Sequence, residues 1–439
     1  MKKITKLFFK IEIGLYILIY SVILILLGVG LPACSDTCET EYSYTYYEPV
    51  YTSLDEIRAS VNSEAPQEIN TMGKLYIKGK YLFITEPNKG VHVYDNSNPA
   101  APINLTFISL PGTFDMAVNG NTLFADSYMD LVAIDISNIQ EVKEIGRLEN
   151  LYGDYNSYGY YVDAAMGVVT DWVEMETVTV SESECATMTN YSVHRAGILV
   201  NEAASASFDA ASAVAPNNPG MGGSMARITI AQNTLFAMSV PEIIPVNINS
   251  PASMAEGNRL NLGWGLETLF PNNTNLFVGA NDGMHILDVA QPLSPQHVST
   301  YQHINSCDPV IVDGDIAYVT LRSGMECQNF TNQLEVIDIS DLTNPQQLYV
   351  YEMSNPHGLG KDGNTLFICD GDAGLKIFDA SDNATIDQNL IKNYKDLFAF
   401  DIIPYDNTAL MIAQDGLYQY DYSDLNDIKC LSKISFTYE

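Results

Sequence analysis

The chain has 439 residues, of which 46% are hydrophobic and 10% aromatic. This composition supports a large buried core and excludes intrinsic disorder for most of the chain. The formal net charge of −33 argues against nucleic acid as a partner, because binding to phosphates requires a basic face.

The N-terminus has the features of a bacterial export signal. Its basic start contains Lys2, Lys3, Lys6 and Lys10. An apolar stretch follows over 13–31, and the sequence Leu-Pro-Ala-Cys at 31–34 resembles a lipobox. We predict a lipoprotein signal peptide over 1–33 and a lipid on Cys34, which attaches the protein to the bacterial outer membrane on its periplasmic or its surface face. The alternative is an uncleaved transmembrane anchor, because about 20 apolar residues can span a bilayer.

A polar, tyrosine-rich tether with one short helix is expected over 34–72. Ser53 and Glu56 have the spacing of a capping box, which predicts a helix over 54–62. Six of the seven cysteines lie beyond Cys34. This even number favours disulfides in an exported protein.

One short sequence unit recurs seven times between residues 73 and 437, mostly at spacings of 40–50 residues. Its copies are GVHVYD (90–95), DLVAID (130–135), EIIPVN (242–247), GMHILD (283–288), LEVIDI (334–339), GLKIFD (374–379) and GLYQYD (416–421). Two apolar strands joined by a tight turn precede each unit, and a turn and a more variable strand follow it. A period near 40 with four short strands is typical of a β-propeller. We therefore predict an all-β, seven-bladed β-propeller of four-stranded antiparallel blades, with six blades as the alternative.

Two details of the repeats carry further expectations. The unit is closed by an aspartate in six copies and by Asn247 in the third, and we expect this side chain to cap the following turn. Between the second and third copies the spacing rises to 112 residues. We interpret the surplus, residues 152–224, as an insertion outside the regular blades.

The repeats resemble a known family. The segments GMHILDVAQPLSP, LEVIDISDLTNP and GVHVYDNSNPAAP are similar to the LVIVD repeat, a propeller-forming motif of bacterial and archaeal surface proteins. Together with CDPVIV, NPHGLG, FICDGDAGLKIFD and the lipobox, they resemble the LVIVD-repeat lipoproteins of the Bacteroidota. The resemblance implies a secreted, lipid-anchored propeller, and it implies no defined reaction or catalytic residue.

Polar side chains recur at one end of the predicted blades. The loop that enters strand one and the loop that joins strands two and three lie on the same rim, around the mouth of the channel. The candidate ligand-binding residues on this rim are Asp115, Arg227, Glu267, Asp308, Arg322, His357, Asp370 and Asp401. They predict a largely acidic funnel that binds a polar ligand or a cation. The alternative is a solvated channel mouth without a ligand.

Cysteines near this rim indicate a disulfide rather than a metal centre. We predict a Cys307–Cys327 bridge, because both residues lie at the same end of one blade, with Cys369 as a competing partner. Cys38 and Cys430 flank the propeller and form a second candidate pair. No metal site is predicted, since the CxxC and HxxxH spacings of zinc ligands are missing.

The sequence favours binding over catalysis. It contains no GxSxG, HExxH or P-loop motif. We predict a non-catalytic binding module of the cell envelope without a cofactor, whose partner is an unknown polar ligand, a glycan or a protein. The segment DGDAG at 370–374 resembles the start of a calcium loop but lacks its later ligands, so calcium is the alternative cofactor. The alternative functions are an extracellular hydrolase or lyase acting on glycans or another polar substrate, and a purely structural envelope protein.

Overall fold

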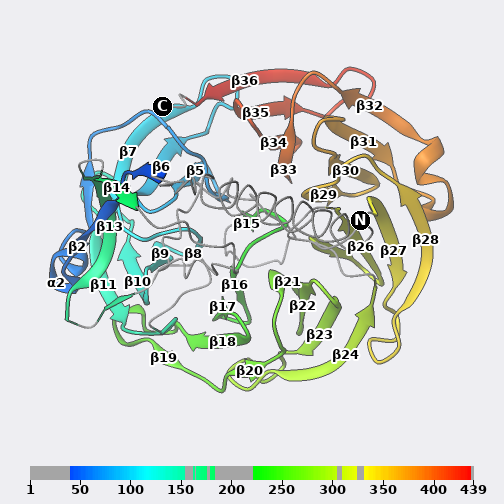
Figure 1. Cartoon of the computed structure of the whole chain (residues 1–439). Helices are drawn as coiled ribbons and strands as arrows, with labels where there is room; N and C mark the ends of the chain where they lie inside the picture. The colour runs from blue at the N-terminus through cyan, green and yellow to red at the C-terminus, as the bar shows by residue number, and fades with distance from the viewer. Residues whose placement is uncertain are drawn as a thin grey trace, which may run out of the picture. The chain divides into compact units, whose positions relative to one another are not determined.

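The computed structural model describes residues 40–153, 162–163, 165–175, 178–182, 221–303, 309–323 and 331–436. The chain divides into two compact units, Met1–Pro49 with Trp172–Leu199 and Val50–Asp171 with Val200–Glu439. In the first unit, strands β1 (Thr40–Tyr44) and β14 (Val178–Glu182) pair antiparallel. In the second unit, successive sheets are arranged in a ring (Figure 1). None of the described helices is long and apolar enough to cross a membrane, and the apolar stretch over 13–31 lies outside the described residues.

The sheets of the ring follow one another along the chain, and within each sheet the strands are named in their spatial order. Sheet 1 consists of β15 (Met221–Gly222), β4 (Leu75–Lys78), β5 (Tyr81–Glu86), β6 (Gly90–Asp95), β7 (Ile103–Ser109) and β3 (Asn62–Glu64). Sheet 2 consists of β8 (Met116–Asn119), β9 (Thr122–Ser127), β10 (Asp130–Asp135) and β11 (Lys143–Leu148). Sheet 3 consists of β16 (Ile228–Ala231), β17 (Thr234–Ser239) and β18 (Glu242–Asn247), whose outer edge pairs with β19 (Ala255–Glu256) and β20 (Leu260–Asn261).

The second half of the ring is more regular. Sheet 4 consists of β21 (Leu266–Asn272), β22 (Asn275–Ala280), β23 (Gly283–Asp288) and β24 (Gln296–Gln302). Sheet 5 consists of β25 (Val310–Asp313), β26 (Ile316–Leu321), β27 (Gln333–Asp338) and β28 (Gln346–Glu352). Sheet 6 consists of β29 (Leu359–Asp362), β30 (Thr365–Cys369), β31 (Leu375–Asp379) and β32 (Leu390–Tyr394). Sheet 7 consists of β33 (Ala399–Tyr405), β34 (Thr408–Ala413), β35 (Gly416–Asp421) and β36 (Lys429–Ser435). The expectation of an all-β fold built mainly from four-stranded antiparallel sheets is confirmed.

The remaining elements are short. A further sheet has the order β12 (Val162–Asp163), β13 (Gly167–Glu174) and β2 (Tyr47–Thr52). The described helices are α2 (Leu54–Arg58) and the 3-10 helices η1 (Pro251–Ser253) and η2 (Asn383–Gln388). The capping box of α2 is confirmed, since the Ser53 and Glu56 side chains each accept a backbone N–H of the other. The helix ends at Arg58, before the predicted residue 62, because the chain turns there into β3, which pairs with β7.

The residues that close each repeat unit act as expected. In all seven copies, the side-chain oxygen accepts a hydrogen bond from the backbone N–H two residues further on, at 2.8–3.0 Å. This contact is an Asx-turn, and Asn247 makes it as well as the six aspartates do. The tight turn before each second strand requires a left-handed backbone, as at Gly79 (φ +57°) and Asn407 (φ +59°).

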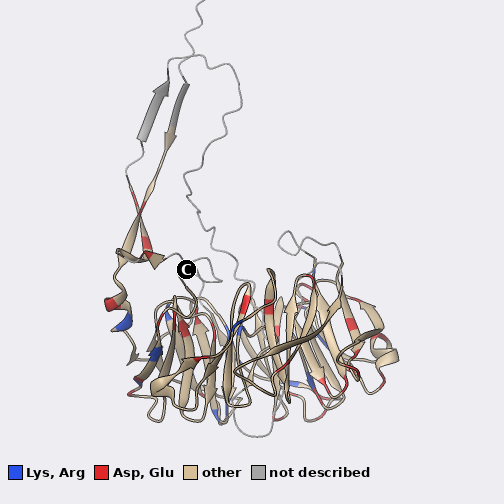
Figure 2. Cartoon of the chain, turned by 90° about the horizontal axis from the view of Figure 1, so that it is seen from below, with Lys and Arg blue, Asp and Glu red and all other residues tan. Residues whose placement is uncertain are grey.

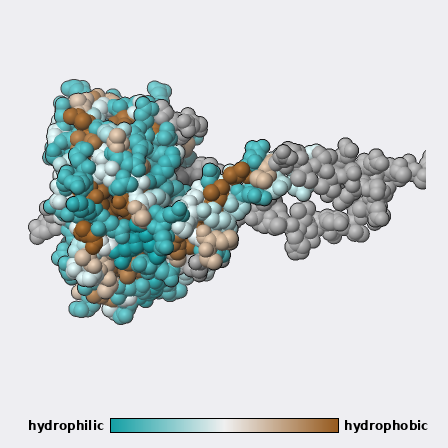
Figure 3. Space-filling view, turned by 90° about the vertical axis from the view of Figure 1, so that its left-hand side faces the viewer, coloured by the Kyte–Doolittle hydropathy of each residue, from teal (hydrophilic) through white to brown (hydrophobic). Residues whose placement is uncertain are grey.

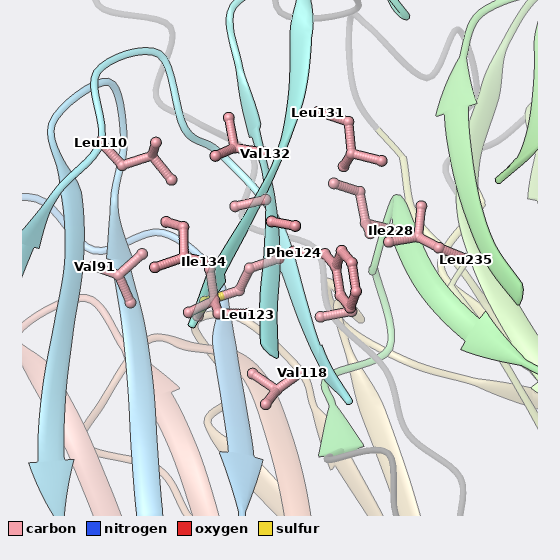
Figure 4. Close-up of a cluster of buried hydrophobic side chains, with 14 of the residues drawn as sticks. Val91, Leu110, Val118, Leu123, Phe124, Leu131, Val132, Ile134, Ile228 and Leu235 are labelled. Carbon is pink, nitrogen blue, oxygen red and sulfur yellow. The ribbon is translucent and has the colours of Figure 1, made fainter. Parts of the chain in front are cut away.

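The hydrophobic core lies between neighbouring sheets, and one position of the repeat supplies its largest members. The third residue of the second strand is at most 2% exposed in every sheet and is aromatic in all but the last: Phe83, Phe124, Phe236, Phe277, Tyr318, Phe367 and Leu410. Figure 4 shows one such cluster, where Phe124 of sheet 2 lies near Ile228 and Leu235 of sheet 3. Burying a side chain of this size contributes about 1.5–3 kcal/mol, so the repeated aromatic stabilises each junction between sheets.

Sheet 7 packs against sheet 1 and closes the ring. Leu410 and Ile412 of sheet 7 share a buried cluster with Leu82 and Ile84 of sheet 1. Next to this cluster, the side-chain amides of Asn96 and Gln419 exchange two hydrogen bonds of 2.8 Å. Because both amides are buried and paired in both directions, they fix the alignment of the first and last repeats.

Two strands of sheet 1 lie in segments that the sequence predicted to be outside the propeller. β3 lies within the expected tether over 34–72, and β15 lies within the expected insertion over 152–224. β3 extends the outer edge of sheet 1, and β15 extends its inner edge by pairing with β4. The tether and the insertion therefore both contribute to the ring.

Candidate functional site

Seven of the eight candidate rim residues are described, and each lies at the same end of its sheet. Asp115, Arg227 and His357 lie just before the innermost strands β8, β16 and β29. Glu267 and Asp401 are the second residue of β21 and the third residue of β33. Arg322 and Asp370 directly follow the second strands β26 and β30. First and second strands pair antiparallel, so both groups occupy one rim. Asp308 lies outside the described residues.

The centre of this rim is filled by the chain itself. The central segment, defined as residues 221–226, begins in β15 and leads into sheet 3, and β15 lies inside the ring in Figure 1. The Ser224 hydroxyl accepts a hydrogen bond from the backbone N–H of Leu359 in sheet 6, at 2.9 Å. The Met225 carbonyl accepts one from the Lys74 ammonium group beside sheet 1, at 2.7 Å. Ser224 is fully buried and Met225 is 1% exposed, so the segment is a packed part of the interior.

The expected acidic funnel is therefore largely closed. Asp370 and Asp401 are fully buried, Asp115 is 2% exposed and His357 is 3% exposed. Asp401 lies against the central segment, with its Oδ1 atom 3.5 Å from the Ser224 hydroxyl. The central segment and the neighbouring loops cover these four side chains, so they face neither an open acidic funnel nor a solvated channel mouth. Ligand binding at this rim stays a prediction.

Asp115 and Asp126 form a buried carboxyl pair between sheets 2 and 3. Asp115 accepts the backbone N–H groups of Arg227, at 2.5 Å, and of Ile228, at 3.0 Å, which joins the start of β16 to sheet 2. Asp126 is 3% exposed and accepts hydrogen bonds on Oδ1 from the N–H groups of Phe114 (2.7 Å) and Asp115 (3.0 Å). Burial raises the pKa of Asp115, and burial together with the Asp115 charge raises the pKa of Asp126 to about 7.

Other acidic groups on the rim are paired within their own sheet, through a position that recurs in the repeat. In four of the repeats, the third residue of the unit contacts an acid that lies three or six residues before it. These pairs are His92 with Glu86 (2.8 Å), His285 with Asp282 (3.3 Å), Lys376 with Asp370 (2.5 Å) and Tyr418 with Asp415 (3.0 Å). His92 and His285 are both buried, and each is also a hydrogen-bonding partner of a carboxylate.

The best-buried of these pairs shows how the rim acids are stabilised. Glu86 is 2% exposed, and its two oxygens meet His92 at 2.8 Å and the Lys89 ammonium group at 2.6 Å. Burial alone would raise the pKa of Glu86, but the hydrogen bonds from His92 and Lys89 outweigh it and lower the pKa to about 2. This carboxylate stays ionised as part of a structural ion pair.

His357 occupies an apolar site on the same rim. Its ring makes edge contacts with Phe398 and Phe400, at centroid distances of 5.4 and 5.5 Å. Within the described residues, neither of its ring nitrogens has a hydrogen-bond partner. Burial, with the nearby Arg322 charge, lowers the pKa of His357 to about 3, so the neutral imidazole is a packing group at physiological pH.

One exposed aromatic residue on this rim was not among the predicted site residues. Trp264 is 78% exposed and stands three residues before Glu267, in the loop that enters sheet 4. Its neighbours Gly263 (φ +102°) and Gly265 (φ +84°) both have left-handed backbones. The Gly-Trp-Gly sequence at a strand entry was the available signal, since glycines on both sides of an aromatic residue favour a loop over a regular strand.

The surface charge follows the composition. Figure 2 shows acidic positions distributed over the sheets with basic positions between them. On the face seen in Figure 3, hydrophobic residues are scattered among hydrophilic ones. The formal net charge of −33 disfavours anionic partners.

The described cysteines are unpaired. Cys369 is a buried free thiol and Cys430 an exposed one. Neither of these two thiols forms a disulfide in the structure. Cys38, the other member of the suggested pair with Cys430, lies outside the described residues. Cys34, Cys307 and Cys327 lie outside the described residues, so lipidation and the Cys307–Cys327 bridge stay predictions. Within the described part of the chain, no three His, Cys, Asp or Glu side chains are grouped so as to hold a metal ion.

Comparison with known proteins identifies the repeats. The LVIVD repeat matches residues 72–107, 113–149 and 306–352, which contain β4 to β6 and most of β7 of sheet 1, and the strands of sheets 2 and 5. The predicted resemblance to this repeat is confirmed. A comparison with curated proteins found no match.

The fold resembles several solved structures at low sequence identity. The computationally designed protein Ika8 is 9% identical over 86% of this chain and 92% of its own, with a TM-score of 0.50. Kluyveromyces lactis Hsv2 is 10% identical over 83% of this chain and 99% of its own, with a TM-score of 0.47. BamB from Moraxella catarrhalis is 9% identical over 87% and 97%, with a TM-score of 0.45. At these identities the likeness concerns the fold alone. Fold and repeats together identify the chain as a β-propeller protein that carries LVIVD repeats.

Proposed function

We propose that this protein is an exported, lipid-anchored β-propeller that binds a ligand at the rim where its innermost strands begin, without catalysing a reaction. In this proposal, sheets 1 to 7 are the seven blades, and the lipid on Cys34 holds the protein at the outer membrane of a bacterium of the Bacteroidota. The partner is a polar ligand, a glycan or a protein rather than a nucleic acid, and no cofactor is required.

The engagement of the rim acids in internal hydrogen bonds is the observation that carries this proposal. A general acid, base or nucleophile must reach its substrate within about 3 Å. Asp115 is bonded to two backbone N–H groups of sheet 3, and Asp370 to two backbone N–H groups and to Lys376. Each bond holds the carboxylate inside the protein and joins neighbouring segments. These acids therefore stabilise the fold, which favours a binding role over the reaction of a hydrolase or a lyase.

The exposed part of the same rim supplies the groups suited to binding. Trp264 presents a large apolar ring to solvent, and the side chain of Asp282 in the adjoining loop of sheet 4 is 57% exposed. Rigid propellers carry function on such loops, because the sheets beneath them fix their positions. The membrane attachment and the location rest on the sequence at 31–34 and 13–31 alone.

The test separates binding from turnover. Full-length protein in detergent micelles is incubated with oligosaccharides and peptides, and both retained ligand and released products are measured. We expect saturable binding of at least one ligand and no product above the protein-free control. Product formation that is lost on mutation of a rim carboxylate would contradict the non-catalytic role.

A further inference from the structure

We propose that Trp264 is a stacking platform for a neutral carbohydrate, with hydrogen bonds to the sugar supplied by the adjoining loop at Asn281 and Asp282. This inference rests on the proposed binding function and names its ligand class. Four features support it: the exposure of the ring, the way its loop is held, the polar groups beside it and the charge of the surface.

The exposure of Trp264 is unusual for so large a side chain. At 78% exposed, its value is the highest among the large hydrophobic residues in the described part of the chain. Exposed aromatic rings that a fold keeps in place mark binding sites, because they lose little conformational freedom when a ligand covers them. A pyranose ring has one face of C–H groups, which matches a flat indole in size and polarity.

Backbone hydrogen bonds on both sides hold the Trp264 loop. The Asn261 side chain accepts the N–H of Gly263 at 3.2 Å, and the Pro241 carbonyl accepts the N–H of Leu262 at 3.0 Å. On the other side, the Gly265 carbonyl accepts the N–H of Asn281 at 2.8 Å. The loop therefore presents the indole on a fixed backbone rather than on a free tip.

The polar partners lie directly against this loop. A β-carbon added at Gly265 would stand 2.2 Å from the Asn281 side chain, so the amide packs against the residue next to Trp264. Asp282 follows Asn281, and its Oδ1 atom contacts His285 at 3.3 Å, which leaves carboxylate capacity for a hydroxyl group. An aromatic face flanked by an amide and a carboxylate suits the C–H face and the hydroxyl groups of a sugar together.

The net charge of the chain and the residues around Trp264 favour a neutral sugar as the ligand. A chain with a net charge of −33 repels uronic acids and sulfated glycans, so the sugar is neutral. A protein hot spot is ordinarily surrounded by contacts that exclude water. Trp264 instead lies between two glycines and near Asn261, Glu267 and Asp282, which favours a hydrated sugar over a protein surface.

The experiment uses the small number of tryptophans. The chain has two, Trp172 and Trp264, so Trp172→Phe leaves Trp264 as the single tryptophan, whose emission is excited selectively at a wavelength that the tyrosines do not absorb. This variant, as the full chain in detergent micelles, is titrated with neutral oligosaccharides of β-linked glucose, xylose, mannose and N-acetylglucosamine. Polygalacturonate serves as the anionic probe. We expect at least one neutral oligosaccharide to change the Trp264 emission with saturation, and polygalacturonate to have no effect.

Variants measured by calorimetry complete the test. Trp264→Ala should weaken binding of that oligosaccharide about tenfold or more and leave the melting temperature unchanged, because the ring is exposed. Asn281→Ala should weaken it several-fold, whereas Trp172→Ala, which removes the other exposed tryptophan, should bind as the wild type does. Binding unaffected by Trp264→Ala, or no binding of any neutral oligosaccharide up to about 10 mM, would overturn the inference.

The outcomes of these experiments distinguish a failure of the carbohydrate inference from a failure of the proposed non-catalytic binding function. Trp264-dependent binding of a purified protein partner, with no sugar bound, would refute the carbohydrate and leave the binding function standing. Cleavage of a sugar that binds at Trp264 would refute the non-catalytic function and leave the ligand class standing.

Discussion

Replacing Asp126 by asparagine should remove a large part of the pH dependence of folding. The asparagine side chain has the same shape, and its oxygen can accept the hydrogen bonds that Asp126 receives from Thr113, Phe114 and Asp115. The substitution therefore removes the ionisation and keeps the contacts. The pKa of Asp126 is raised from its ordinary value of 3.8 to about 7, chiefly by burial.

The sign and size of the effect follow from linkage. Because the folded pKa lies above the unfolded one, folded protein binds more protons between pH 3.8 and about 7, and the free energy of unfolding falls as pH rises through this window. One pKa unit corresponds to about 1.4 kcal/mol, so the full displacement is on the order of 4 kcal/mol, of which about 2 kcal/mol is lost between pH 5 and 7. Asp126→Asn should lack this loss and be more stable than the wild type at pH 8.

The assay is urea denaturation at pH 5, 6, 7 and 8, comparing the free energies of unfolding of variant and wild type at each pH. Asp135→Asn is the matched control, since Asp135 lies in the same sheet and makes an exposed Asx-turn that Asn247 makes equally well. The control should leave the difference nearly constant with pH. The role assigned to Asp126 is wrong if the free energy of unfolding of Asp126→Asn depends on pH as that of the wild type does. It is also wrong if the stability of the variant relative to wild type is lower at pH 8 than at pH 5.

Three further predictions concern other parts of the molecule. His357→Phe should abolish a pH dependence of the opposite sign. The pKa of His357 is lowered from 6.5 to about 3, so the wild type loses stability as pH falls below 6.5, by about 2 kcal/mol at pH 5. The urea midpoints of variant and wild type should therefore diverge towards acid pH. Cys34→Ala should leave unprocessed precursor and abolish labelling by a palmitate analogue; normal processing and labelling would exclude the lipobox. Non-reducing peptide mapping should join the peptides of Cys307 and Cys327, and recovery of both as free thiols would refute the bridge.

Repetition made the scaffold predictable from the sequence. A local pattern that recurs in each unit, such as the closing aspartate and its turn, identifies its own structure through contacts two residues apart. The family resemblance supplied the repeat type, and the comparison with known proteins bore it out.

The rim was less predictable because its contacts are distant in sequence. The hydrogen bond between Ser224 and Leu359 joins residues 135 positions apart, and that between Asp115 and Arg227 joins residues 112 positions apart. No local sequence pattern therefore predicts that these side chains are buried. The sequence placed Asp115 and Asp401 at the correct end of their strands but could not reveal that the end of the insertion fills the space between them. Trp264 was overlooked because it occurs in one repeat only, outside the periodic positions.

Hydrogen–deuterium exchange over residues 221–228 would show whether the rim is closed by the chain itself. This stretch is packed inside the ring, and its contacts engage the rim acids, as when Arg227 and Ile228 donate their N–H groups to Asp115. We predict strong protection of these two amides, and of the Leu359 amide that donates to Ser224, compared with the exposed turn at 232–233. Exchange at 221–228 as fast as in that turn would mean an open channel with solvated acids, and would contradict the scaffold role assigned to them.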